Sequence, residues 1–438
     1  MRRIQVLTRT VLAATLGACL AVGCAAPPED MAAQNAPAAP HWVGTWSTAL
    51  VSQPAASGPP RPGVPSAPDV ANRTLREIVR VSIGGPSVRI VVSNLYGAED
   101  LNLGGASVAK RASEGQIQGN AMPVTFSGRE AMLIPVGASI VSDPVRLDVA
   151  PLTDLVVDLF VASTPTVLTT HSAAMQTNYV SEAGNHVGAA TLPGATTVAS
   201  WYFLARVDVE STSDAIVTFG DSITDGTGST LDANARWPNF LAGRLAESPD
   251  GPMGVLNAGI AGNRVLTDGL GVNALARFDR EVLAQPGVTH VFVLMGINDF
   301  GLGNIRGFGF PARDPAATAD DVIAGYKQLI ARAHARGLTI WGATLTPFEG
   351  TTIPGYFTPE GEVQRQAVNA WIRTSGAFDG VVDFDEVIRD PEHPTQMQAQ
   401  YNSGDSLHPN DAGYAAMANA IDMAMLRQSV GSMAVATQ

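Results

Sequence analysis

The chain has 438 residues, of which 45% are hydrophobic and 15% charged, and its formal net charge is −13. This composition is typical of a globular protein with a large core, and the length allows two domains; an intrinsically disordered chain is excluded. The negative charge argues against a nucleic-acid partner, because phosphate binding needs clustered Lys and Arg, and such a cluster occurs only at the extreme N-terminus.

The N-terminus predicts export. Three arginines accompany the short apolar run "VLAATLGACLAVG", which is too short to span a bilayer comfortably, so residues 1–24 are expected to be a signal peptide. The small residues before Cys24 resemble a bacterial lipoprotein cleavage site. Cys19 is a competing match, and ordinary cleavage near Ala25–Ala26 is the alternative. We expect a cell-envelope lipoprotein, periplasmic or secreted, whose only membrane contact is an N-terminal lipid anchor.

Cysteine and metal-ligand patterns exclude several chemistries. Both cysteines lie within this N-terminal segment, so the folded part is expected to contain no disulfide, no cysteine nucleophile and no thiolate metal site. The sequence has no HExxH pair, no dense His/Asp/Glu cluster and no phosphate-binding P-loop. We therefore expect neither a metal nor a cofactor.

The next segments differ in composition. Residues 25–40 are rich in Pro and Ala and are predicted to be a linker. Residues 41–210 contain β-branched runs separated by Gly, Pro, Asp and Asn turns, which predicts a β-sandwich-like domain.

From about residue 211 to residue 430 the pattern changes to apolar strands that alternate with amphipathic helices. One of these helices has Thr318 and Asp321 as a plausible N-cap pair and Gly337 as a stop signal. Such alternation implies a parallel sheet covered on both faces, in which sites form at the carboxyl ends of the strands. Strands are expected at 215–219, 254–257, 290–295, 338–344 and 380–384.

The first strand is followed by "TFGDSITDG", which contains Ser222. This serine comes at the start of a predicted helix, where free backbone N–H groups and the helix dipole favour developing negative charge. A catalytic serine is one interpretation. The other is that Asp-Ser simply caps the helix, since both residues are common caps.

Two further segments follow later strands. In "NAGIAGNR", Gly259 and Gly262 can bring backbone N–H groups close to a ligand, although paired glycines also occur in simple turns. In "MGINDFG", Asn298 can donate its amide N–H to an oxyanion, and Asp299 is expected to orient the loop. The alternative is that this Asn-Asp pair simply forms a turn and has no catalytic role.

The last segment, "SGDSLHPN", places Asp405 three residues before His408. One turn can then hold the carboxylate against Nδ1 of the imidazole, which leaves Nε2 able to accept a serine proton. Ser406 is expected to be only a spacer in this turn. His171 could line a cleft. The other histidines are predicted to be structural and to lack an obvious partner: His41, His186, His290, His334 and His393.

The ordered set "GDSIT", "GIAGN", "GIND" and "DSLHP" resembles the SGNH/GDSL hydrolase superfamily over about residues 214–426. The resemblance implies a three-layer α/β/α flavodoxin-like domain with a serine esterase mechanism. Ser222 would be the nucleophile, His408 the base and Asp405 its orienting partner. Ser222, Gly262 and Asn298 would form the oxyanion hole. The N-terminal half resembles the β-rich extension of a bacterial two-domain subgroup.

These observations predict an exported serine esterase that forms an acyl-enzyme. We expect its substrates to be short acyl groups on carbohydrates, or other small esters. A lipase or lysophospholipase and an acyltransferase remain as alternatives, because the same residues serve all three. A binding lipoprotein without catalysis is less favoured, since the set of nucleophile, base, orienting acid and oxyanion donors is complete.

Overall fold

The computed structural model describes four stretches of the chain: residues 39–55, 67–305, 316–424 and 426. The predicted signal peptide, both cysteines and almost all of the predicted linker lie outside these residues. Within the described stretches, no helix is both long and apolar enough to cross a bilayer.

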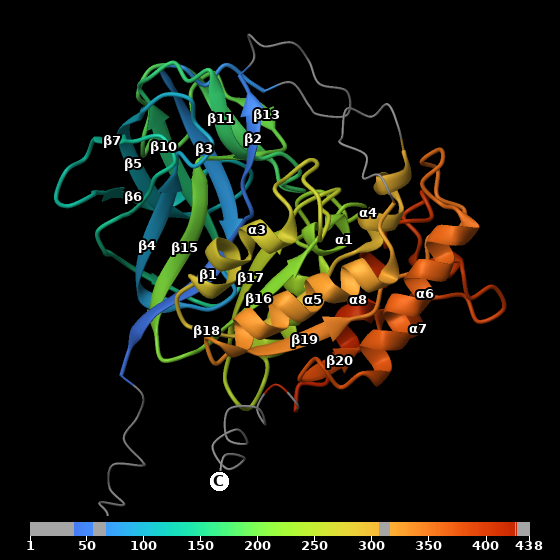
Figure 1. Ribbon diagram of the computed structural model, residues 1–438. Helices are drawn as coiled ribbons and strands as arrows, with labels where there is room; N and C mark the ends of the chain where they lie inside the picture. The colour runs from blue at the N-terminus through green and yellow to red at the C-terminus, as the bar shows by residue number, and fades with distance from the viewer. Residues whose placement is uncertain (1–38, 56–66, 306–315, 425, 427–438) are drawn as a thin grey trace, which may run out of the picture. The chain divides into compact units, whose positions relative to one another are not determined.

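The first half is built from antiparallel sheets, as predicted (Figure 1). One sheet has the order β1-β15-β4-β8 with β9 beside β4. A larger sheet has the order β13-β12-β3-β10-β5-β6 with β7 beside β5, and a third has the order β14-β11-β2. Their inward-facing side chains form one hydrophobic core. The strands are β1 (His41–Ser47), β2 (Val51–Pro54), β3 (Arg73–Arg80), β4 (Gly85–Ser93), β5 (Leu101–Arg111), β6 (Ile117–Val124), β7 (Met132–Ile134), β8 (Ser139–Val141), β9 (Val145–Val149), β10 (Asp154–Val161), β11 (Val167–His171), β12 (Asn178–Ala183), β13 (Thr196–Val198), β14 (Trp201–Tyr202) and β15 (Leu204–Ser211).

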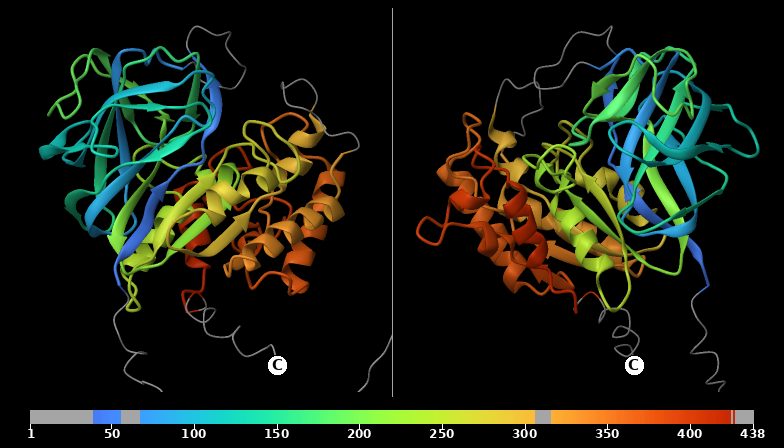
Figure 2. Two further views of the ribbon diagram at one scale, coloured as in Figure 1. Left: turned by 60° about the vertical axis from the view of Figure 1, so that its left-hand side comes forward. Right: turned by 180° about the vertical axis from the view of Figure 1, so that it is seen from behind.

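The second half is a parallel sheet of order β17-β16-β18-β19-β20, which is the flavodoxin-like order. Helices α5 and α6 pack together on one face, and α2 and α8 pack together on the other, so the predicted three-layer fold is confirmed (Figures 1 and 2). The elements are β16 (Ala215–Gly220), α1 (Ser222–Asp225), α2 (Trp237–Ala246), β17 (Gly254–Gly259), α3 (Ala274–Phe278), the π-helix η2 (Asp279–Leu283), β18 (Val288–Leu294), α4 (Ile297–Phe300), the 3₁₀ helix η3 (Leu302–Asn304), α5 (Ala319–His334), β19 (Thr339–Ala343), α6 (Pro359–Thr374), β20 (Gly380–Val382), α7 (Phe384–Ile388), the 3₁₀ helix η4 (Ala399–Tyr401) and α8 (Asp411–Asn419).

Local sequence signals explain where these elements begin and end. The side chains of Thr318 and Asp321 form the expected capping box at the start of α5, and the helix ends at His334, three residues before Gly337, which adopts a φ of +69°. All residues of β16 are buried, because helices cover the sheet on both sides.

Strand β1 of the antiparallel half lies close to the parallel sheet. The Gly44 N–H donates a hydrogen bond to the Pro286 carbonyl (3.0 Å), and a Cβ on Gly254 would come within 2.2 Å of the Gly44 oxygen. The Val255 N–H donates to Ser82 Oγ (2.9 Å). Backbone packs on backbone here, so side chains larger than glycine are excluded. The predicted boundary at residue 211 falls at the end of β15 and remains a prediction.

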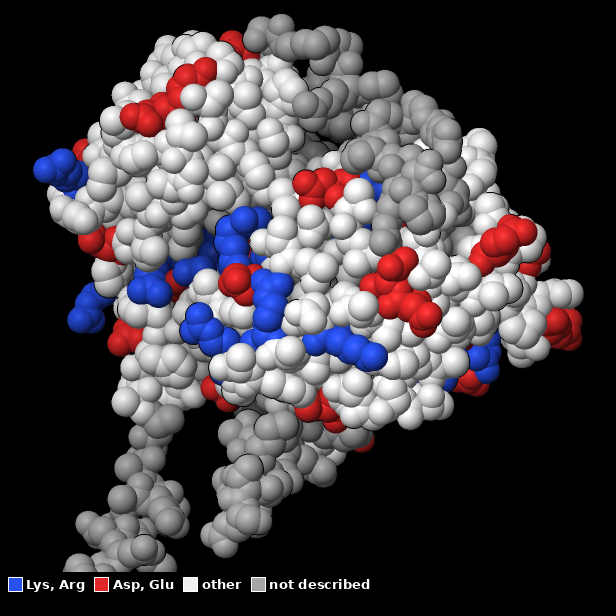
Figure 3. Space-filling view, in the orientation of Figure 1, with Lys and Arg blue, Asp and Glu red and all other residues white. Residues whose placement is uncertain are grey.

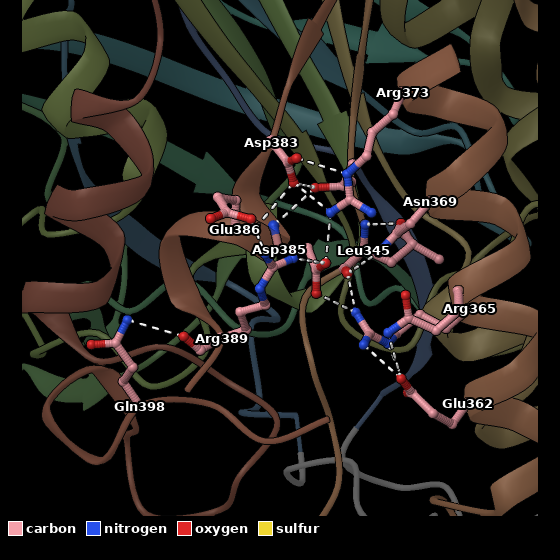
Figure 4. Close-up of polar contacts among 12 residues, drawn as sticks. Leu345, Glu362, Arg365, Asn369, Arg373, Asp383, Asp385, Glu386, Arg389 and Gln398 are labelled. Carbon is pink, nitrogen blue, oxygen red and sulfur yellow. Dashed lines mark hydrogen bonds and ion pairs between the residues drawn. The ribbon is translucent and has the colours of Figure 1, made fainter. Parts of the chain in front are cut away.

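A buried ion network joins α6 to α7 (Figure 4). The Asp385 carboxylate is 1% exposed and pairs with Arg365 (2.5 Å), Arg373 (2.6 Å) and Arg389 (3.3 Å). Arg365 is fully buried and also pairs with Glu362 (2.7 Å). Because each charge has several partners, the burial of these ions is compensated.

Lys and Arg side chains gather on the face between β15 and α5 (Figure 3). Arg206 of β15 pairs with Asp208 (2.6 Å), and Arg332 of α5 pairs with Asp279 (2.6 Å). These two guanidinium groups therefore have carboxylate partners.

Candidate active site

The turn between β16 and α1 positions Ser222. Asp221 is the N-cap of α1, and its side chain accepts a hydrogen bond from the Ile223 N–H (3.0 Å). A Cβ at Gly220 would come within 2.1 Å of Thr224 Oγ1, so only glycine permits this tight turn. The capping interpretation is therefore correct for Asp221, whereas Ser222 is the first residue of the helix and its side chain is free to face the sheet edge.

His408 connects Ser222 to Asp405. Its Nε2 lies 2.8 Å from Ser222 Oγ, and its Nδ1 lies 2.6 Å from Asp405 Oδ2. A carboxylate oxygen can only accept, so Nδ1 carries the proton and Nε2 is the acceptor for the serine hydroxyl. The one-turn spacing seen in the sequence thus gives the expected geometry.

Asp405 is held as a carboxylate. Partial burial acts to raise its pKa, but hydrogen bonds from the His408 ring, the charge of that ring and the backbone N–H groups of Leu407 and His408 outweigh burial. The pKa of Asp405 therefore lies well below its usual range. A carboxylate at this place stabilises an imidazolium on His408 when the ring takes up a proton.

Asn298, in α4, points its amide into the same site from a fixed position. Its Nδ2 donates to the Asn263 carbonyl (3.0 Å), and its Oδ1 accepts from the Tyr356 hydroxyl (2.8 Å). The second N–H of the amide is left to bind a ligand. Asn263 and Tyr356 were not predicted as site residues from the sequence. Asn263 could have been found because it directly follows Gly262, whereas no local signal marks Tyr356.

Gly262 turns the loop that follows β17. Its φ is +69°, and a Cβ would come within 2.8 Å of Leu270 Cδ1. Asp299 holds the next part of this loop, because its carboxylate accepts from the N–H groups of Val265 (2.8 Å) and Leu266 (3.1 Å), as expected. Within the described residues, the N–H groups of Ser222 and Gly262 have no hydrogen-bond partner.

A pocket of about 390 Å³ opens at this edge of the sheet. It brings Ser222, Gly262, Asn298 and His408 together, with Asp405 behind the imidazole. The rest of its lining is mainly apolar: Thr227, Ala261, Leu270, Leu302, Thr352, Ile353, Pro354, Tyr356 and Leu407. Four polar groups therefore face an apolar cavity.

A second carboxyl group lies beside the nucleophile. Asp221 is 1% exposed, and burial raises its pKa to about 7. Its Oδ2 has no hydrogen-bond partner within the described residues. This group acts as a helix cap and is not in contact with His408.

Several histidines differ from the sequence-based prediction; Nδ1 of His290, for example, lies 2.8 Å from Thr289 Oγ1. His334 was expected to lack a partner, but its Nε2 lies 2.9 Å from Asp379 Oδ2, because the end of α5 lies beside the loop before β20. His171 is buried and contacts Asp225 (2.9 Å). Among the described residues, no group of three or more His, Cys, Asp or Glu is arranged to hold a metal.

The domain thus has a three-layer α/β/α fold, with a Ser-His-Asp chain of hydrogen bonds at its pocket. Residues 218–416 match the model of the GDSL-like Lipase/Acylhydrolase family. No curated protein is significantly similar to the chain.

Solved structures similar to the chain align with about half of it. A GDSL-like lipase from Bacteroides thetaiotaomicron is 19% identical, with 49% of this chain and 88% of that chain covered and a TM-score of 0.37. A carbohydrate acetylesterase family member from Sinorhizobium meliloti is 18% identical (50% and 99% covered, TM-score 0.38). The aryl esterase of M. smegmatis is 16% identical (48% and 96% covered, TM-score 0.38).

Proposed function

We propose that the protein is a serine esterase that hydrolyses carboxylic esters through an acyl-enzyme. The observation that carries this proposal is the chain of hydrogen bonds from Asp405 through His408 to Ser222 Oγ, at 2.6 and 2.8 Å. His408 Nε2 takes the proton of Ser222 as its oxygen attacks the ester carbonyl, and it then gives that proton to the departing alcohol. Water, activated by His408, releases the acid and restores the serine.

The oxyanion of each tetrahedral intermediate would accept hydrogen bonds from three donors: the backbone N–H groups of Ser222 and Gly262 and the free N–H of the Asn298 amide. The support is that both backbone groups are unpaired within the described residues and that the amide is fixed by Asn263 and Tyr356. Because these donors are oriented before the reaction, each contributes about 2.7–4 kcal/mol to lowering the barrier.

The lining and the volume of the pocket indicate which class of ester it could bind. Its apolar lining supports an ester with an apolar acyl or aryl group, and its volume of about 390 Å³ limits that group to a modest size. We propose short acyl groups on carbohydrates or other small esters as substrates, with the sugar or alcohol leaving towards solvent. A series of nitrophenyl esters of increasing chain length, compared with acetylated xylan, tests this. Highest kcat/KM on the longest chains would favour a lipase instead.

A transferase remains the second candidate, because a sugar or alcohol hydroxyl can replace water at the acyl-enzyme. Product analysis with an added alcohol distinguishes the two: only a transferase forms the new ester in place of the free acid.

We also propose that the protein is exported and anchored by a lipid at its N-terminus. The support is the charged head, short apolar run and small residues before Cys24. Metabolic labelling with a radioactive fatty acid tests it. Label that is lost in Cys24→Ser and kept in Cys19→Ser identifies the cleavage site, and the reverse result assigns it to Cys19. No label in the wild type argues for ordinary cleavage.

A fluorophosphonate probe tests the mechanism. We expect labelling and ester hydrolysis by the wild type, and loss of both in Ser222→Ala. Ser406→Ala is the matched control, since Ser406 belongs to the literal GDSL string but its hydroxyl only accepts a hydrogen bond from Asn402 (3.0 Å). Labelling that persists in Ser222→Ala or disappears in Ser406→Ala would contradict the assignment, and an unlabelled wild type would favour the binding lipoprotein.

A further inference from the structure

A second carboxylate supports the loop that carries Gly262. Asp225, at the end of α1, is 3% exposed, and its Oδ2 accepts a hydrogen bond from the Ala261 N–H (3.2 Å). Ala261 directly precedes Gly262, whose N–H is the proposed oxyanion donor. A movement of the Asp225 side chain would therefore move Ala261, whose carbonyl carbon is bonded to the nitrogen of this donor.

The other oxygen of Asp225 contacts the β-rich half. His171, the last residue of β11, lies with Nε2 2.9 Å from Asp225 Oδ1 and Nδ1 2.7 Å from the Ala49 carbonyl oxygen. A carboxylate and a carbonyl oxygen can only accept hydrogen bonds, so both ring nitrogens must donate. His171 is therefore an imidazolium when both bonds are made, and it is paired with an ionised Asp225.

Apolar packing from the β-rich half reaches the same loop. Ile260 forms a small buried cluster with Val51, the first residue of β2, and with Ala49, two residues before it. The loop from Ile260 to Gly262 is thus held at two successive residues: Ile260 by packing, and Ala261 through Asp225 and His171.

We propose that His171 is a positioning residue for ester hydrolysis: as an imidazolium it fixes Asp225 and, through the Ala261 N–H, the oxyanion donor of Gly262. The β-rich half thereby completes the active site of the other half. This inference rests on the proposed esterase function.

Charged groups around His171 determine how the pair responds to pH. Burial acts to lower the pKa of His171, but the Asp225 charge and the hydrogen bonds to Asp225 and Ala49 outweigh burial, so the pKa is raised. Arg236 also faces the pair and opposes protonation; its Nε donates to the Asp225 carbonyl (2.7 Å). A raised pKa means that the ion pair is intact below the ordinary His pKa and is lost as the pH rises through the raised value. We therefore expect kcat to fall as the pH rises above the ordinary His pKa.

The test compares His171→Ala, which removes both bonds, with His171→Gln, whose amide can still donate to Asp225 but cannot titrate. His334→Gln is the matched control, because His334 makes a similar Nε2 contact with Asp379 (2.9 Å) away from the site. Each variant is assayed as the full chain, kcat is normalised to the fluorophosphonate-labelled fraction, and kcat and KM are measured from acid to alkaline pH.

We expect His171→Ala to lower kcat about 10- to 100-fold with KM changed less than about 2-fold, because the affected contact is made to the transition state. His171→Gln should recover most of the kcat and lose the fall of kcat with rising pH, and His334→Gln should match the wild type. A kcat of His171→Ala equal to that of the wild type, or an unchanged fall of kcat with rising pH in His171→Gln, overturns the inference. If His171→Ala does not fold, the profile of His171→Gln decides alone. Failure of the esterase proposal is separate: Ser222→Ala would then keep its activity.

Discussion

Replacing Asp405 by Asn should damage the proposed catalysis more than removing its side chain. Asp405 Oδ1 accepts the N–H groups of Leu407 (2.9 Å) and His408 (2.8 Å), and Oδ2 accepts Nδ1 of His408 (2.6 Å). In Asp405→Asn, the amide oxygen would still accept the hydrogen bonds from the two backbone N–H groups. The NH₂ group of the amide would then face Nδ1 of His408. Two donors cannot face each other, so the ring proton moves to Nε2, and His408 can no longer accept the Ser222 proton.

The two substitutions are expected to differ in the size of their effect. A triad held in the wrong tautomer loses about 10⁴ in kcat, or about 5 kcal/mol of barrier. In Asp405→Ala the imidazole can take either tautomer and loses one charged hydrogen bond, about 1.5–3 kcal/mol, which corresponds to about 10- to 150-fold. We therefore expect Asp405→Ala to be more active than Asp405→Asn.

The assay is kcat on a nitrophenyl ester, normalised to the folded fraction by circular dichroism. Because the pKa of Asp405 lies well below its usual range, its carboxylate stays ionised in mild acid and should not limit the wild type there. Equal activities, or a more active Asp405→Asn, would refute the tautomer argument.

Three further predictions concern supporting residues. Tyr356→Phe removes the hydroxyl that orients the Asn298 amide and should lower kcat about 5- to 10-fold at constant KM; a changed KM alone would count against this role. Asp221→Asn keeps an N-cap oxygen and removes a buried acid whose pKa is about 7. Thermal melting near neutral pH should therefore show a melting temperature equal to or above that of the wild type. A melting temperature lower by several degrees would contradict this prediction. Asp385→Ala removes a carboxylate partner from Arg365, Arg373 and Arg389. Urea titration should show that the free energy of unfolding falls by about 3–5 kcal/mol, while ester hydrolysis per folded molecule stays unchanged. A fall of less than about 1 kcal/mol would show that the stability of the fold does not depend on this network.

The sequence was informative where local patterns determine structure. Apolar runs bounded by turn residues located the strands of the parallel sheet, and the Thr318–Asp321 pair located the start of α5. The three-residue spacing of Asp405 and His408 fits within one turn, so their contact could be expected without knowledge of the rest of the fold.

Contacts between distant segments could not be predicted in this way. The bond from Tyr356 to Asn298 and the contact of His171 with Asp225 depend on how separate loops and sheets pack, and neither residue lies in a distinctive local pattern. His334 shows the same limit, because its partner Asp379 follows a different helix. Local propensity says little about such tertiary partners.

The position of β1 has a consequence for when the chain can fold. β1 is the first described strand to be synthesised, yet it pairs with β15, at the far end of the β-rich half, and packs on β17 of the parallel sheet. Neither neighbour exists until much more of the chain has been made, so the N-terminal half cannot close early as an independent unit, unlike the usual domain-by-domain order. Closure of this half around β1 therefore has to wait until β15 and β17 have both been synthesised.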